Sequence, residues 1–290
     1  MQSIKTIYKI GPGPSSSHTF GPMMASKYIN EQYPEATNFK VTLFGSLALT
    51  GKGHLTDKII LKTLGASKCE IIFDMKTAVE HPNTMIIEVF DNDTKVAQHT
   101  FVSIGGGKIE IDGKKGNVDP EIYPHTKMDD IQVYCNERHL RLDQYIDEVE
   151  DSDFDSYMNQ IFKQMLKTVN TGLKKTGVLP GSLKIDRVAH ALHQSAQSCS
   201  DIQDKKSLLL SSYAYAANEQ NASGGIVVTA PTMGSCGVLP SLVYHFYHDQ
   251  KYPKKTLIQG LKVAGLIGNL IQTNATISGA KAGCQAEVGA

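Results

Sequence analysis

Hydrophobic and polar positions divide the chain into a strand-rich first part and a helical second part. Between residues 39 and 111, short β-branched runs end at glycines or Asp-Gly turns, which is typical of β-strands. The runs cover residues 39–44, 70–73, 85–90, 95–104 and 108–111. Two helices are expected among them, one after Gly21-Pro22 and one after Thr56-Asp57, a pair that can cap a helix. The sequence therefore predicts an α+β N-terminal domain with a mostly antiparallel sheet.

From about residue 138 the apolar positions recur at helical spacing. Helical segments are expected at residues 142–149, 158–169, 184–198, 205–219, 238–249 and 255–273. From Ala222 onward glycines are dense, and small residues allow helices to pack closely or a backbone to approach a ligand. We therefore expect a mainly α-helical second domain, with the two domains at residues 1–140 and 141–290.

Composition restricts the possible partners and the location of the chain. Its 290 residues carry 29 Lys and Arg against 29 Asp and Glu, so the formal net charge is zero, which argues against nucleic acid as a partner. No apolar run approaches the roughly 20 residues that span a bilayer, and the first residues lack the apolar core of a signal peptide. We expect a cytoplasmic protein that does not contact a membrane. The five cysteines are odd in number and widely spread, unlike a disulfide framework.

The first candidate site is a loop in which hydroxyl side chains surround one imidazole. Ser15, Ser16, Ser17 and Thr19 flank His18 between two Gly-Pro-containing stretches. Such a loop, just before a predicted helix, can present several donors to a carboxylate. The alternative is a polar loop with a capping serine.

The second candidate is a glycine-rich strand-to-helix turn. It fails as a phosphate-binding loop because five residues separate Gly45 from Gly51 where that motif has four, and Gly53 stands where Ser or Thr binds magnesium. The turn presents His54 and Thr56, and such a turn can hold a catalytic base. The alternative is a helix cap beside a surface histidine.

Two cysteines lie next to glycine in tracts of small residues, Cys236 and Cys284. Backbone amides and the start of the following helix would favour a thiolate at Cys236, although a buried, inert cysteine is the alternative. A pair of thiolates suits a soft metal or an iron–sulfur cluster. Cys69, Cys135 and Cys199 lack this context and are interpreted as structural.

Taken together, the motifs resemble those of the bacterial iron–sulfur L-serine dehydratases, or L-serine ammonia-lyases. The resemblance includes Ser-Ser-Ser-His-Thr at 15–19 and Thr-Gly-Lys-Gly-His-x-Thr-Asp at 50–57. It continues with Thr-Gly-Val-Leu-Pro-Gly at 176–181, Asn-Glu-x-Asn-Ala at 218–222, Thr-Ala-Pro-Thr-x-Gly-x-Cys-Gly at 229–237 and Ile-Ser-Gly-Ala-x-x-Gly-Cys-Gln-x-Glu-Val-Gly at 277–289. The motifs follow the family's order along nearly the whole chain.

The resemblance implies a [4Fe–4S] cluster held by three cysteines, with one iron open to substrate. Cys236 and Cys284 match two of these ligands. The family's third cysteine falls just after the Glu-Val-Gly near residue 289, and this sequence stops at Ala290. The resemblance therefore implies a helical domain that is incomplete at its C-terminus, and a polypeptide that is inactive as given or needs a further segment.

The implied reaction is dehydration and deamination of L-serine to pyruvate and ammonia, a step in amino-acid degradation and gluconeogenesis. The open iron acts as Lewis acid, His54 removes the α-proton, and His18 is the alternative base. Substrate binding is assigned to Ser15, Ser16, Ser17, Thr19 and Thr56. The site is expected between the two domains, and the protein is expected to be a homodimer. Two alternatives stay open: a related β-elimination lyase for threonine or cysteine, and a non-catalytic amino-acid-binding module.

Overall fold

The computed structural model describes residues 1–115 and 119–275, which form two compact units. The β unit comprises residues 14–115, and the helical unit comprises residues 1–13 together with 119–275. The chain thus starts in the helical unit, leaves it to form the β unit, and returns. The predicted domain boundary at residues 140/141 stays a prediction.

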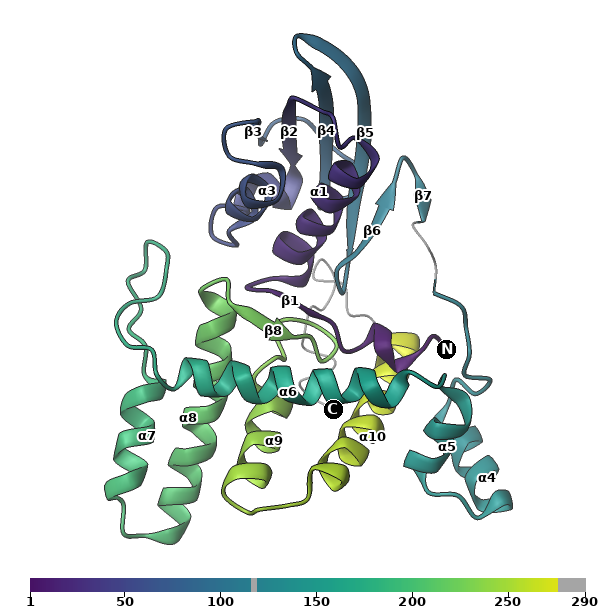
Figure 1. The fold of residues 1–290 in the computed structure, drawn as a ribbon, viewed down its shortest axis with the longest axis vertical. Helices are drawn as coiled ribbons and strands as arrows, with labels where there is room; N and C mark the ends of the chain where they lie inside the picture. Colours follow the sequence, from purple (N-terminus) through teal and green to yellow (C-terminus); the bar gives the residue numbers. More distant parts are fainter. Residues whose placement is uncertain (116–118, 276–290) are drawn as a thin grey trace. The chain divides into compact units, whose positions relative to one another are not determined.

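The β unit is built on one six-stranded sheet (Figure 1). Its strands are β2 (Asn38–Phe44), β3 (Cys69–Asp74), β4 (Thr84–Asp91), β5 (Thr94–Gly105), β6 (Lys108–Ile111) and β7 (Lys114–Lys115). The order is β3-β2-β4-β5-β6-β7. Only β2 and β3 run parallel, and the other neighbouring pairs are antiparallel. The expected α+β domain with a mostly antiparallel sheet is confirmed.

The α-helices among the described residues of the β unit are α1 (Gly21–Gln32), α2 (Gly45–Thr50) and α3 (Thr56–Leu64), and the π-helical turn η2 (Ser16–Phe20) precedes α1. Alternation along the strands puts Val41 and Ile87 into a core that also contains Ile29 of α1 and Ile60 of α3. The short α2 was not expected from the sequence. It starts because Gly45 adopts a φ of +51°, a conformation that glycine tolerates at no steric cost.

The second unit is mainly helical, as expected. Its helices are η1 (Ile4–Thr6), α4 (Met128–Arg138), α5 (Leu142–Val149), α6 (Phe154–Gly172), α7 (Ala189–Ser198), α8 (Ile202–Ala222), α9 (Val238–His248) and α10 (Lys254–Asn274). The long α6 lies across α8, α9 and α10 and packs against all three (Figure 1). Residues 184–188, expected to be helical, lie before the first turn of α7.

A two-stranded antiparallel ribbon joins the start of the chain to a distant segment. Strand β1 (Ile10–Pro12) pairs with β8 (Ile226–Val228), and Gly11 lies opposite Val227. Strand β1 was not expected from the sequence. The ribbon places the residues that precede the serine-rich loop inside the helical unit.

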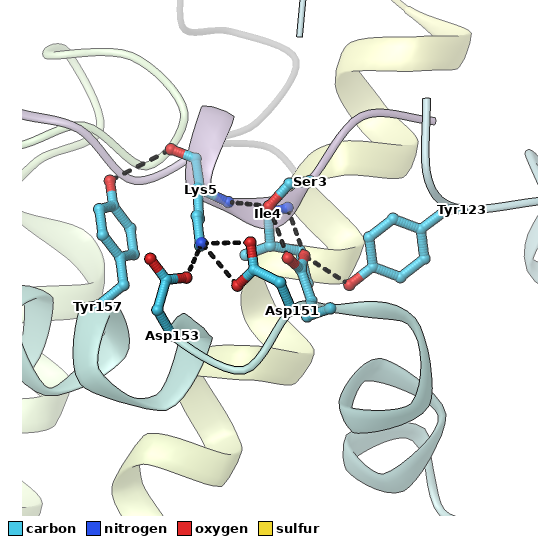
Figure 2. A network of polar contacts seen from close by, with 8 residues as sticks. Ser3, Ile4, Lys5, Tyr123, Asp151, Asp153 and Tyr157 are labelled. Carbon is cyan, nitrogen blue, oxygen red and sulfur yellow. Dashed lines mark hydrogen bonds and ion pairs between the residues drawn. The ribbon is translucent and has the colours of Figure 1, made fainter. Parts of the chain in front are cut away.

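Polar contacts hold the N-terminal segment against the helical unit (Figure 2). The Glu150 carboxylate accepts hydrogen bonds from Ser3 Oγ at 2.6 Å, from Ile4 N at 2.8 Å and from the Tyr123 hydroxyl at 2.9 Å. Beside it, Lys5 Nζ forms ion pairs with Asp151 and Asp153. The Ile4 and Tyr8 side chains are fully buried in the core that α6 and α10 also line.

Over residues 1–115 and 119–275, no helix has both the length and the hydropathy that a membrane-crossing segment needs.

Candidate functional site

The serine-rich loop forms one tight turn at the start of the β unit. After Ser15, residues Ser16–Phe20 form η2, a π-helical turn in which Phe20 N donates to Ser15 O at 3.0 Å. Ser15 Oγ accepts from His18 N at 3.1 Å and so caps the turn. Ser16, Ser17 and Thr19 are buried. The turn therefore holds its hydroxyls and its imidazole in a fixed arrangement.

The His18 ring has a hydroxyl partner on each nitrogen. Nδ1 lies 2.9 Å from Ser17 Oγ, and Nε2 lies 2.8 Å from Ser46 Oγ. Burial, and secondarily the neighbouring His54, lowers the pKa of His18 to about 4. The ring is therefore neutral near pH 7, with one nitrogen donating and the other accepting.

The ring of His54 lies beside that of His18, with the centroids 4.7 Å apart. Its Nδ1 is 3.0 Å from the backbone oxygen of Thr50. A carbonyl oxygen only accepts, so Nδ1 carries the proton and Nε2 has the free lone pair. Thr19 Oγ1 donates to the His54 backbone oxygen at 2.7 Å, which fixes the two histidine segments to each other.

Thr56 connects the same two segments from the other side. Its side chain is fully buried, and Oγ1 donates to the backbone oxygen of His18. The expectation that Thr56-Asp57 caps a helix was wrong: the N-cap of α3 is Leu55, at a φ of 57°, with no capping side chain. The Thr56 hydroxyl is used to hold the serine-rich loop instead.

The structure thus brings the predicted residues of the β unit into one cluster and adds one that sequence reasoning missed. Ser46 follows Gly45 in the glycine-rich turn, but nothing in the sequence there indicates its partner. Ser46 is the second residue of α2, and its Oγ lies 2.8 Å from Nε2 of His18, which is 28 residues earlier in the chain. A neutral imidazole with two hydroxyl partners next to a second imidazole with a free Nε2 can bind a polar ligand and accept a proton.

Cys236 lies in the helical unit, in the turn between β8 and α9. It is fully buried, and its Sγ is 3.7 Å from Asn218 Oδ1 of α8. Burial raises the pKa of the Cys236 thiol to about 12. The expectation that amides and the helix start favour a thiolate was therefore wrong for this environment, because desolvation of the charge outweighs them.

The segment leading to Cys236 is closely tied to the N-terminal residues of the same unit. Thr229 Oγ1 donates to Ile7 O at 2.6 Å, and Gly13 N donates to Gly225 O at 2.9 Å. A Cβ on Gly13 would lie 2.1 Å from the side-chain oxygen of Asn221, so only glycine fits there. The serine-rich loop begins two residues later in the sequence.

A buried ion pair lies next to Asn218 in α8. Arg187 Nη1 is 3.8 Å from Glu219 Oε2, and both side chains are almost completely buried. Glu219 Oε1 also accepts from Val188 N at 2.6 Å and Ala189 N at 3.0 Å, at the start of α7. The Asn-Glu-x-Asn-Ala run was the only sequence signal for this pair, and it gave no sign of Arg187.

The described cysteines can be compared with the cluster expected from the sequence. Cys284 lies outside the described residues, and within 1–115 and 119–275 no three Cys, His, Asp or Glu side chains are grouped so as to hold a metal ion. Cys236 fits as one soft sulfur ligand, since it is buried with an amide as its side-chain partner. Cys69, Cys135 and Cys199 belong to β3, α4 and the end of α7.

The chain has paired histidines in its α+β unit and a buried cysteine in its helical unit. Its sequence matches two family profiles. The profile described as serine dehydratase beta chain matches residues 3–72, and that described as serine dehydratase alpha chain matches residues 56–290. The chain belongs to the serine dehydratase family.

Curated relatives match along the whole chain. An L-serine dehydratase of Haemophilus influenzae is 32% identical over 100% of this chain and 76% of its own length. L-serine dehydratase 2 of Escherichia coli is 33% identical with the same coverage. An L-serine dehydratase of Helicobacter pylori is 32% identical over 99% of this chain and 75% of its own length.

Proposed function

We propose that this chain serves the dehydration and deamination of L-serine to pyruvate and ammonia. The observation that carries the proposal is the cluster of two imidazoles and several hydroxyls in the β unit, in a chain whose curated relatives are named L-serine dehydratases. The reaction needs a base for the α-proton and donors for the carboxylate, and the cluster contains both kinds of group.

His54 is the better base of the two histidines. Its Nε2 lone pair is free because Nδ1 donates to Thr50 O. His18 is the weaker candidate, since its pKa is lowered to about 4 and both of its nitrogens have hydroxyl partners. A general base works best when its pKa lies near the working pH. We therefore assign the α-proton to His54 and a positioning role to His18.

The serine hydroxyls supply donors for the substrate carboxylate. Ser15 Oγ accepts from His18 N and lies 3.4 Å from Ser17 Oγ, so its proton can go either to Ser17 or to a ligand oxygen. Ser17 can direct its proton to His18 or to a ligand, because a neutral imidazole can donate to it instead. We propose that Ser15, Ser16 and Ser17 contact substrate, and that Thr19 and Thr56 hold the loop through the backbone oxygens of His54 and His18.

We propose Cys236 and Cys284 as sulfur ligands of a [4Fe–4S] cluster. When bound, an iron with an open coordination position supplies Lewis-acid chemistry at the serine β-hydroxyl, since hydroxide is a poor leaving group. The N-terminal ribbon supports a link between the two parts of the mechanism, because the segment just before the serine-rich loop pairs with the strand that leads to Cys236. The expected homodimer stays a prediction.

The test is Asn substitution of His54 in protein reconstituted anaerobically with iron and sulfide. A positioned base contributes about 10²–10⁴-fold, so H54N should lower kcat by that factor. The matched control is H139N, at an exposed position with a φ of 54° that asparagine accepts. An H54N protein with turnover within a few-fold of the H139N control would remove His54 as the base. Pyruvate, 2-oxobutyrate and sulfide measured side by side separate serine from threonine and cysteine as substrate.

A further inference from the structure

Asn218 lies directly against the cysteine that the proposed function assigns to the cluster. Its amide oxygen is 3.7 Å from Cys236 Sγ, close enough to accept the thiol proton. Cys236 is fully buried, whereas Asn218 is exposed on the surface of α8. The amide therefore contacts the sulfur with its oxygen, although the residue as a whole is exposed.

Gly237 provides the space for this amide. A Cβ at position 237 would lie 2.6 Å from Asn218 Nδ2 and 2.9 Å from Asn218 Cγ, distances that real Cβ atoms do not reach. The backbone of Gly237, at φ −93° and ψ −21°, is open to any residue. Its conformation does not require glycine, and the nearest obstacle to a Cβ is the Asn218 amide, which an alanine would displace from the sulfur.

The chemistry of the sulfur changes when it binds a metal. A thiol donates a proton to Asn218 Oδ1, but a metal-bound sulfur has lost that proton to solvent and only accepts. A half-turn about the Asn218 Cβ–Cγ bond exchanges Oδ1 for Nδ2 and points an N–H at the sulfur. Groups that hydrogen-bond to ligand sulfurs tune the stability and the potential of iron–sulfur sites.

We propose that Asn218 is a positioning residue for Cys236, whose amide accepts the thiol proton before metal binds and donates an N–H to the sulfur afterwards, in the space left by Gly237. This inference rests on the proposed function only in taking Cys236 as a metal-bound sulfur. Aspartate has the shape of asparagine without the donor, and leucine has neither donor nor acceptor, so the two substitutions separate the two halves of the switch.

The first test uses protein without iron. The infrared S–H stretch of Cys236, identified by its loss in Cys236→Ser, should move to higher frequency in Asn218→Leu and in Gly237→Ala, because both remove the acceptor from the thiol. It should move to lower frequency in Asn218→Asp, because a carboxylate is a stronger acceptor. An unchanged band in all three variants would show that the amide does not contact the thiol and would overturn the inference.

The second test follows iron release to a chelator after anaerobic reconstitution. Asn218→Asp and Asn218→Leu should both lose iron about 10–100-fold faster than wild type, the range found when a partner of a metal ligand is removed. Asn136→Asp, an exposed site on α4, is the control for added charge. Release rates equal to the control would overturn the Asn218 inference and leave the cluster assignment standing. Wild-type protein that takes up no iron would overturn both.

Discussion

Replacing Glu150 by alanine is expected to destabilise the helical unit by about 3–5 kcal/mol. The carboxylate accepts from Ile4 N and the Tyr123 hydroxyl, both on residues at most 2% exposed, and from the half-buried Ser3. A hydrogen bond to a charged group contributes about 1.5–3 kcal/mol, and a buried donor left without its acceptor adds a desolvation cost. Two such donors account for the range, because Ser3 can turn to water.

The ion pairs of Lys5 in the same network are expected to contribute much less. Its partners Asp151 and Asp153 have side chains that are 63% and 75% exposed. Exposed pairs contribute about 0–1 kcal/mol, so Lys5→Met should cost less than about 1 kcal/mol. Glu150→Gln should cost about 1–2 kcal/mol, because its amide oxygen can still accept from Ile4 and Tyr123 while the charge is lost.

Urea unfolding followed by far-ultraviolet circular dichroism measures these differences, since helices dominate the signal. Hydrogen exchange at the Ile4 amide reports the same contact locally, and it should speed up in Glu150→Ala and change little in Lys5→Met. The reasoning is refuted if Lys5→Met costs as much as Glu150→Ala, because exposed charge pairs would then outweigh hydrogen bonds to buried donors.

Three further outcomes are expected. The pKa of His18 is about 4 in the folded chain and 6.5 in the unfolded chain, so the unfolded chain binds more protons between these pH values. The free energy of unfolding should therefore fall by up to about 3 kcal/mol from pH 6.5 to 4. In His18→Asn, the urea midpoint should depend less on pH over this range. With a pKa of about 12, the Cys236 thiol should resist iodoacetamide at pH 8 until the protein is unfolded, whereas half-buried Cys199 should react before Cys236, as followed by peptide mass spectrometry. Gly172→Ala should lower the melting temperature, because the Cβ would lie 2.2 Å from Ala216 O, whereas Gly260→Ala has open space and should raise stability by about 0.5–1 kcal/mol.

Most strands and most helices could be predicted because their signals are local. Residues of β2 and β4 alternate between the core and the other face, and turn residues mark their ends. Helix α4 escaped prediction for a physical reason: only Ile131 and Cys135 of its eleven residues are buried, too few to form an apolar stripe. Helix α2 depends on the positive φ of Gly45, which a sequence does not display.

Residue types identified the candidate site, but contacts between distant residues decide how it works. His54 could be chosen as a base from its turn, yet its free Nε2 follows from a bond to Thr50 O that no motif shows. The Ser46 partner of His18 is 28 residues away, and the Asn218 partner of Cys236 is 18 residues away. The expected thiolate was wrong because burial, which only the fold determines, controls the pKa of Cys236.

The N-terminal segment supports the proposed reaction although none of its side chains takes part in the chemistry. Residues Ile10–Pro12 pair with a strand more than 200 residues later in the chain. Gly13, which lies two residues before the serine-rich loop, donates a backbone hydrogen bond to Gly225. The same strand leads to Cys236. If the loop and Cys236 serve one reaction, as we propose, the ribbon connects their segments, and Glu150 holds Ser3 and Ile4 at the start of the segment that leads into the ribbon. Loss of the Glu150 contacts should therefore reduce serine turnover more than its effect on stability alone explains, although Glu150 contacts neither histidine nor cysteine among the residues that the structure describes.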